Sequence, residues 1–142
     1  MSETASATFD EIKVLVVDKP KNLKALIDAA LLTNPSSIGT VLADINRRGS
    51  IGSTEIAPDF FLPHVVTDAV PRIQLVLGTS DTTTWLVVLM PTNATPGNKK
   101  AVSVLMRRLA YDDDIAALRS FHTTEQFQHY LSKLATPERN QR

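Results

Sequence analysis

The run of residues 85–90, Trp-Leu-Val-Val-Leu-Met, constrains the fold more than any other part of the sequence. A strand with one face in water alternates apolar and polar residues, whereas this run is almost continuously apolar. We therefore predict an interior strand at residues 84–90 that is covered on both faces. Residues 12–17 are rich in β-branched side chains and residues 72–77 partly alternate, so both are predicted to be strands as well.

Two helices are predicted between the first of these strands and the middle of the chain. Asp18, followed by Pro20, resembles a helix start, and apolar residues then recur at helical spacing. Residues 34–36, Asn-Pro-Ser, end this helix and supply a cap for the next one. The second helix is predicted to end near Gly49, and the small polar residues 50–54 to form a loop.

Three more helices are predicted after the interior strand. Thr95 is suited to be an N-cap, with Pro96 at the first helical position. Acidic residues open a short helix at residues 112–118, where they suit the helix dipole. Thr123 and Gln126 offer a capping box for the last helix. Helices on either side of a strand-rich middle predict an α/β sandwich, a sheet with helices on both faces.

The composition is that of an ordinary soluble globular protein. Apolar residues make up 43% and charged residues 21%, and the 15 basic side chains balance 15 acidic ones, so no overall field favours nucleic acid or a membrane. The chain has no cysteine, which excludes disulfides and thiolate catalysis and fits a cytoplasmic location. We predict a flexible tail at residues 1–10, a single domain at 11–135 and a second tail at 136–142.

His64 is the most conspicuous candidate for chemistry. It follows Pro63, which fixes its own backbone and biases Leu62 toward extended geometry. We predict a short strand before it that ends at a rigid corner and presents the imidazole. A stiff support of this kind is a plausible way to mount a nucleophile.

The residues around His64 resemble a known family. Arg48 is followed by Gly52-Ser53-Thr54 and then by Leu62-Pro63-His64. This order and spacing resemble the enzyme IIA domain of the phosphotransferase system (PTS), type 2, of the fructose, mannitol and nitrogen-regulatory kind. The resemblance covers roughly residues 11–134 and implies a mixed sheet flanked by helices.

The resemblance also implies a set of site residues. His64 matches the phosphorylated histidine and Arg48 the active-site arginine, while Ser53, Thr54 and Asn98 are candidates for binding the phosphate. An arginine guanidinium suits phosphate oxygens, and hydroxyl and amide groups donate further hydrogen bonds. No cofactor and no metal ion is expected. Two departures from the family pattern are the Ala-Pro-Asp at residues 57–59, where glycines are usual, and Asn98 in place of a second histidine.

The partners implied by the resemblance are proteins. HPr would donate a phosphoryl group from its own phosphohistidine, and a IIB domain or a regulatory target would receive the group or respond to it. The alternative is a degenerate module of the same fold that binds a partner without efficient phosphotransfer, which the missing glycines and the absent second histidine motivate. Sugar specificity, the choice between transport and regulation, and oligomeric state stay open.

Other chemistries have less in the sequence to support them. A hydrolase that pairs His64 with Asp59 or Asp68 lacks a nucleophile elbow. His122 and His129 lack the four-residue spacing of a helical metal pair.

Overall fold

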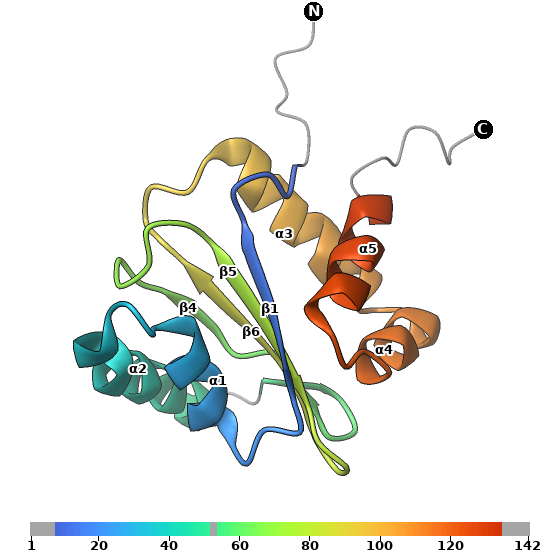
Figure 1. The fold of residues 1–142 in the computed structure, drawn as a ribbon, viewed down its shortest axis with the longest axis horizontal. Coiled ribbons are helices and arrows are strands. Elements are labelled where there is room, and N and C mark those ends of the chain that lie inside the picture. Colours follow the sequence, from blue (N-terminus) through green and yellow to red (C-terminus); the bar gives the residue numbers. More distant parts are fainter. Residues whose placement is uncertain (1–7, 52–53, 135–142) are drawn as a thin grey trace, which may run out of the picture.

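The computed structural model describes residues 8–51 and 54–134, and for residues 49–51 the backbone alone. Within these ranges the chain forms one mixed sheet with helices on both of its faces (Figure 1). The α/β/α sandwich predicted from the sequence is therefore confirmed.

The sheet has the strand order β1-β5-β6-β3-β2, and β4 also pairs with β6. β6 is antiparallel to β5 and parallel to β3 and β4, whereas β1 and β5 are parallel to each other. β1 therefore forms one edge of the sheet, and β4 and the β2–β3 hairpin lie on the other side of β6. The strands are β1 (Lys13–Asp18), β2 (Glu55–Ala57), β3 (Phe60–Phe61), β4 (His64–Val66), β5 (Gln74–Thr79) and β6 (Thr84–Met90).

Each face of the sheet has its own hydrophobic core. Alternate side chains of β5 and β6 enter the two cores: Leu75 and Leu86 lie on one face, Val76 and Val87 on the other. The first core is closed by α3 (Pro96–Arg108), α4 (Asp112–Arg119) and α5 (Thr124–Leu134), the second by α1 (Leu23–Ala30) and α2 (Ile38–Ile51). Figure 1 shows these two groups of helices on opposite sides of the strands. β6 has no solvent-facing side, which accounts for its unbroken apolar sequence.

The predicted caps of α3 and α5 are confirmed. The Thr95 hydroxyl accepts a hydrogen bond from the Asn98 backbone N–H at 3.2 Å. At α5 the capping box is reciprocal, since the Gln126 N–H donates to the Thr123 hydroxyl and the Thr123 N–H donates to Gln126 Oε1. These caps rest on contacts within a few residues, so local sequence was sufficient to predict them.

Two helix boundaries differ from the prediction. α1 is capped by Asn22, whose side chain accepts from the Ala25 N–H at 3.0 Å, and not by Asp18, which belongs to β1. α2 continues through Gly49 to Ile51, into a segment predicted to be a loop. Packing of a helix on a sheet can outweigh the helix-breaking tendency of a single glycine, which is about 1 kcal/mol.

The strand predicted before His64 is divided in two. A turn at Pro58 and Asp59 separates β2 from β3, and Asp59 has a φ of 59°, in the left-handed region that aspartate tolerates better than most residues. The Glu55 carboxylate accepts the Asp59 N–H at 2.9 Å and stabilises this turn. His64 is accordingly the first residue of β4 and does not end a strand.

Candidate functional site

The backbone of His64 is held by the sheet. β4 lies parallel to β6 with His64 opposite Val88, and the Val88 N–H donates to the Pro63 carbonyl at 2.9 Å. Pro63 has no N–H of its own, so its place just before the strand costs the sheet no hydrogen bond. The histidine thus begins a short strand on a rigid support.

The imidazole of His64 is half-buried and incompletely partnered. Its Nε2 atom is buried and has no hydrogen-bond partner in the described part of the chain. Burial, together with the positive charge of Arg48, lowers the pKa of His64 below its ordinary value. The ring is therefore neutral at neutral pH, which is the form in which a ring nitrogen has a free electron pair.

Arg48 comes to this site from α2. It lies in the last turn of the helix, where a cation also complements the helix dipole, and its side chain is exposed. α2 packs against β4, the strand that carries His64. The positive charge of Arg48 contributes to the lowered pKa of His64, so the two side chains lie within electrostatic range of each other.

Of the other predicted phosphate-binding residues, Thr54 is described and Ser53 lies outside the described residues. The Thr54 carbonyl accepts the Leu62 N–H at 2.9 Å, which ties the start of β2 to the residue two before His64. Its side chain is half-buried and makes no hydrogen bond to another described residue. The Thr54 hydroxyl is thus available as a donor close to the chain segment of the histidine.

Asn98 is used in a different way from the one predicted. Its side-chain amide donates to the carbonyls of Thr8 and Asp10, both at 2.9 Å, and the side chain is buried. The Thr8 N–H in turn donates to the Gly97 carbonyl at 3.2 Å. Residues 8–10, predicted to be part of a tail, are therefore attached to the start of α3. Because both amide hydrogens are engaged, Asn98 has no donor left for a phosphate, and we leave it out of the site.

The carboxylates considered for a hydrolase do not join His64 by a hydrogen bond within the described ranges. Asp68 accepts instead from the backbone N–H and the hydroxyl of Thr92, which lower the pKa of this exposed carboxyl group. His122 Nδ1 lies 2.9 Å from Asp18 Oδ1, and both of these residues are distant from His64 in the sequence. Across residues 8–51 and 54–134 there is no cluster of three or more histidine and acidic side chains that could hold a metal ion.

Arg119 is a residue of this region that the sequence analysis missed. Its guanidinium donates to the Pro58 carbonyl at 2.6 Å and lies over the ring of Phe60, 5.5 Å from the centroid. Arg119 thus holds the β2–β3 turn, which occupies the place of the usual glycines in the family pattern. Since 61 positions separate Arg119 from Pro58, no local signal could have identified this contact.

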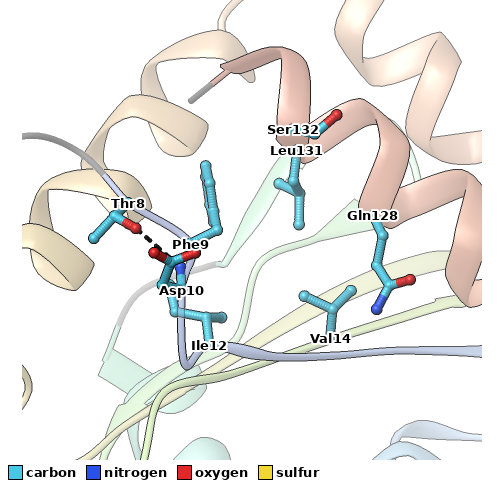
Figure 2. A pocket seen from close by; sticks show the side chains of 8 residues that line it. All are labelled: Thr8, Phe9, Asp10, Ile12, Val14, Gln128, Leu131 and Ser132. Carbon is cyan, nitrogen blue, oxygen red and sulfur yellow. Dashed lines mark hydrogen bonds between the residues drawn. The ribbon is translucent and has the colours of Figure 1, made fainter. Parts of the chain in front are cut away.

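A cavity of about 380 Å³ lies at the β1 edge of the sheet, away from His64. Figure 2 shows it between residues 8–10, β1 and α5, with an apolar wall and a few polar side chains around it. Its lining residues are Thr8, Phe9, Asp10, Ile12, Val14, Gln128, Leu131 and Ser132. None of the predicted site residues belongs to it, so the cavity is not the place where His64 would react.

The sandwich described above has the fold of a PTS IIA domain. The solved structure of Nitrogen Regulatory Protein IIA-Ntr from Neisseria meningitidis matches it with a TM-score of 0.57 over 88% of this chain and 95% of that chain. The two sequences are 19% identical, so the likeness shows the fold and leaves activity to be argued from the site. No protein-family model and no curated protein matches the chain. No described helix combines the length and apolar character needed to cross a lipid bilayer.

Proposed function

We propose that the chain is a PTS IIA-like phosphoryl-accepting domain and that His64 carries the phosphoryl group. The observation that supports this most directly is the position of the imidazole, which is half-buried at the start of β4 and within electrostatic range of Arg48, and both features lower its pKa. A neutral imidazole is the nucleophile that phosphoryl transfer requires.

The site residues have complementary roles in this proposal. In the transition state the transferred group carries negative charge on three oxygens, so catalysis depends on position and on charge stabilisation. Arg48 provides a permanent cation and a planar set of donors for those oxygens. The Thr54 hydroxyl and, as predicted from the sequence, the Ser53 hydroxyl donate further hydrogen bonds. The proposal includes no metal ion or cofactor.

HPr is the proposed donor, and a IIB domain or a regulatory target is the proposed recipient. The fold neighbour is a nitrogen-regulatory IIA protein, which favours the regulatory role over sugar transport. A cytoplasmic location is part of this proposal, because phospho-HPr is expected in that compartment.

The direct test is incubation with phosphoenolpyruvate, enzyme I and HPr. We expect one acid-labile phosphoryl group per chain by intact mass, and none in His64→Ala. His129→Ala is the matched control, because His129 lies on α5 and makes no ring hydrogen bond in the described part of the chain. Full labelling of His64→Ala would refute the assignment.

Two observations favour a second candidate, a IIA-like interaction module without efficient phosphotransfer. His64 Nε2 is buried, and Asn98, which stands where many family members have a second histidine, has its donors engaged. Under this alternative labelling is negligible, while HPr or another PTS protein still binds equally well to the wild type and to His64→Ala. Binding isotherms measured beside the labelling assay separate the two candidates.

A further inference from the structure

We propose that the cavity at the β1 edge of the sheet is a second binding site, and that its ligand is a small amine with an apolar, aromatic body. This inference is independent of the proposed function, because neither His64 nor Arg48 lines the cavity. It is drawn from the apolar wall of the cavity, from the free edge of β1 and from the single charge among the lining residues.

The size and the wall of the cavity suit a small organic molecule. Its volume of about 380 Å³ lies within the range of about 300–1,000 Å³ that is usual for ligand sites. Ile12 and Leu131 contribute buried side chains to the wall, and Phe9 adds a half-buried aromatic ring. Figure 2 shows Leu131 reaching from α5 toward Val14 of β1, so apolar side chains face one another across the space. Such a wall favours an apolar ring over a strongly hydrated molecule.

β1 presents unused backbone groups beside the cavity. The Lys13 N–H donates to the Ile73 carbonyl at 2.9 Å, so the backbone of Lys13 faces β5. Because the backbone groups of successive strand residues face opposite edges, the N–H and carbonyl of Val14 point to the open edge of the sheet. The next outward N–H, that of Val16, is taken by the Thr124 hydroxyl at 3.0 Å. An added peptide strand would need that N–H as well, so the free backbone of Val14 suits a small ligand better than a strand.

The polar side chains of the lining determine the charge of the ligand. The hydroxyl of Thr8 already accepts the Asp10 N–H at 3.0 Å, and that of Ser132 donates to the His129 carbonyl at 2.7 Å. The side chains of Asp10 and Gln128 have no hydrogen-bond or ionic partner among the described residues. Of the lining residues, Asp10 alone is charged. An ammonium group, which donates hydrogen bonds and accepts none, is complementary to this carboxylate, whereas an anionic ligand would be repelled.

The backbone of Asp10 is held in place for this contact. Its carbonyl accepts a hydrogen bond from the Asn98 amide at 2.9 Å, which attaches this part of the wall to α3. A wall that is fixed before the ligand arrives loses less entropy on binding. In the proposed complex the ammonium group binds Asp10, the aromatic body packs against Phe9 and Leu131, and a ring N–H donates to Gln128.

NMR titration of the full ¹⁵N-labelled chain with tryptamine tests the proposal. Tryptophol and indole-3-propionate are the matched ligands, because they carry a hydroxyl and a carboxylate in place of the ammonium group. With tryptamine we expect saturable shifts of the backbone amides of Val14 and Leu131, and none at Val88, which pairs with His64. Tryptophol should bind about three- to fivefold more weakly, as expected for the loss of an exposed ion pair, and indole-3-propionate more weakly still.

Asp10→Asn should weaken tryptamine binding by about three- to fivefold and leave tryptophol binding unchanged. Glu11→Gln is the matched control, since it removes the same charge from the neighbouring residue, which does not line the cavity. Equal binding of the three ligands, an equal loss in both variants, or no saturable shift at the cavity would overturn the inference. Shifts of Val14 that follow protein concentration without any ligand would assign the cavity to a second copy of the chain and would overturn it too. None of these outcomes affects the labelling of His64, so the inference and the proposed function fail separately.

Discussion

Asp114 and His64 are polar side chains enclosed by the same fold, but their surroundings are opposite. The Asp114 carboxylate is 7% exposed and accepts three hydrogen bonds, from Arg108 Nε at 3.2 Å, Arg108 Nη2 at 3.0 Å and the Tyr130 hydroxyl at 2.6 Å. Burial and the contact with Asp114 raise the pKa of Tyr130 well above its usual value, so the hydroxyl stays protonated as a donor. His64 Nε2 has no hydrogen-bond partner within residues 8–51 and 54–134.

The difference separates structural polar groups from a candidate reactive one. Buried polar groups in native proteins are nearly always hydrogen-bonded, because leaving one unpaired costs about 1–3 kcal/mol. Asp114 follows this rule, and so does Asn98, whose amide hydrogens are both used. Among the described residues His64 Nε2, Gln74 Oε1 and Thr79 Oγ1 depart from it. His64 differs from the other two because the charge of Arg48 also lowers its pKa, and perturbed groups of this kind concentrate at functional sites.

The largest expected effect is on the rate of phosphoryl transfer when Arg48 is substituted. Arg48→Ala should lower the initial rate of phosphoryl transfer from HPr by about 10²-fold, because a charged donor to the transferring group is lost. Arg48→Lys should recover part of the rate, since lysine restores the charge without the planar donors. Rapid-quench labelling measures both variants.

Arg47→Ala is the matched control for Arg48. It removes the same charge from the neighbouring position of α2, where the guanidinium is paired with Asp44 at 2.7 Å. An equal loss of rate in both variants would mean that the general charge of α2, and not a specific contact, is what His64 requires.

Substitution of Asp114, whose carboxylate accepts three hydrogen bonds, should lower the stability of the fold. Asp114→Ala leaves Arg108 and Tyr130 without their common acceptor and should lower the free energy of unfolding by about 2–3 kcal/mol. Urea denaturation measures this change. Asp28→Ala, which breaks an exposed ion pair with Lys24 on α1, should cost no more than about 0.5 kcal/mol. Equal losses of unfolding free energy in the two variants would mean that the buried hydrogen bonds of Asp114 contribute no more than an exposed ion pair.

Substitution of Asn98 should also lower the free energy of unfolding, but by less than substitution of Asp114. Asn98→Ala removes two hydrogen bonds that attach residues 8–10 to α3, and the free energy of unfolding should fall by about 1–2 kcal/mol. The initial rate of phosphoryl transfer should be unchanged, since the amide does not face the phosphate in this proposal. A large loss of rate without a loss of stability would return Asn98 to the site.

The smallest expected effect is a pH dependence of the free energy of unfolding that is caused by His64. Because the pKa of His64 is lowered in the folded protein, the unfolded chain binds the proton at a higher pH than the folded chain. The contribution of neutral His64 is therefore present above the unfolded pKa, about 6.5, and is lost as the pH falls through it toward the folded value. Between about pH 7.5 and pH 5.5 the wild type should lose more stability than His64→Gln. Parallel pH profiles of the two proteins would contradict this.

How well the sequence predicted each structural feature depends on how far apart in the chain the contacting residues lie. The α3 cap at Thr95 and the α5 capping box join residues three positions apart, and both were predicted correctly. The division of the strand before His64 was not predicted, although Asp59 in a positive-φ turn after Pro58 left a weak signal. The contact of Arg119 with Pro58 left none, because it depends on how α4 packs.

By itself, the sequence predicted most of the helices and strands and the two-sided covering of β6, because periodicity and capping are properties of short segments. The residues proposed for the reaction came from the resemblance of the segment from Arg48 to His64 to a known family. Only the tertiary structure decided which polar groups are satisfied. The Asn98 amide donates to carbonyls 88 and 90 positions away, while His64 Nε2 is buried and has no hydrogen-bond partner among the residues that the structure describes. Hydrogen bonding and desolvation depend on atoms that folding brings together from distant parts of the chain, so they are not encoded in any local pattern.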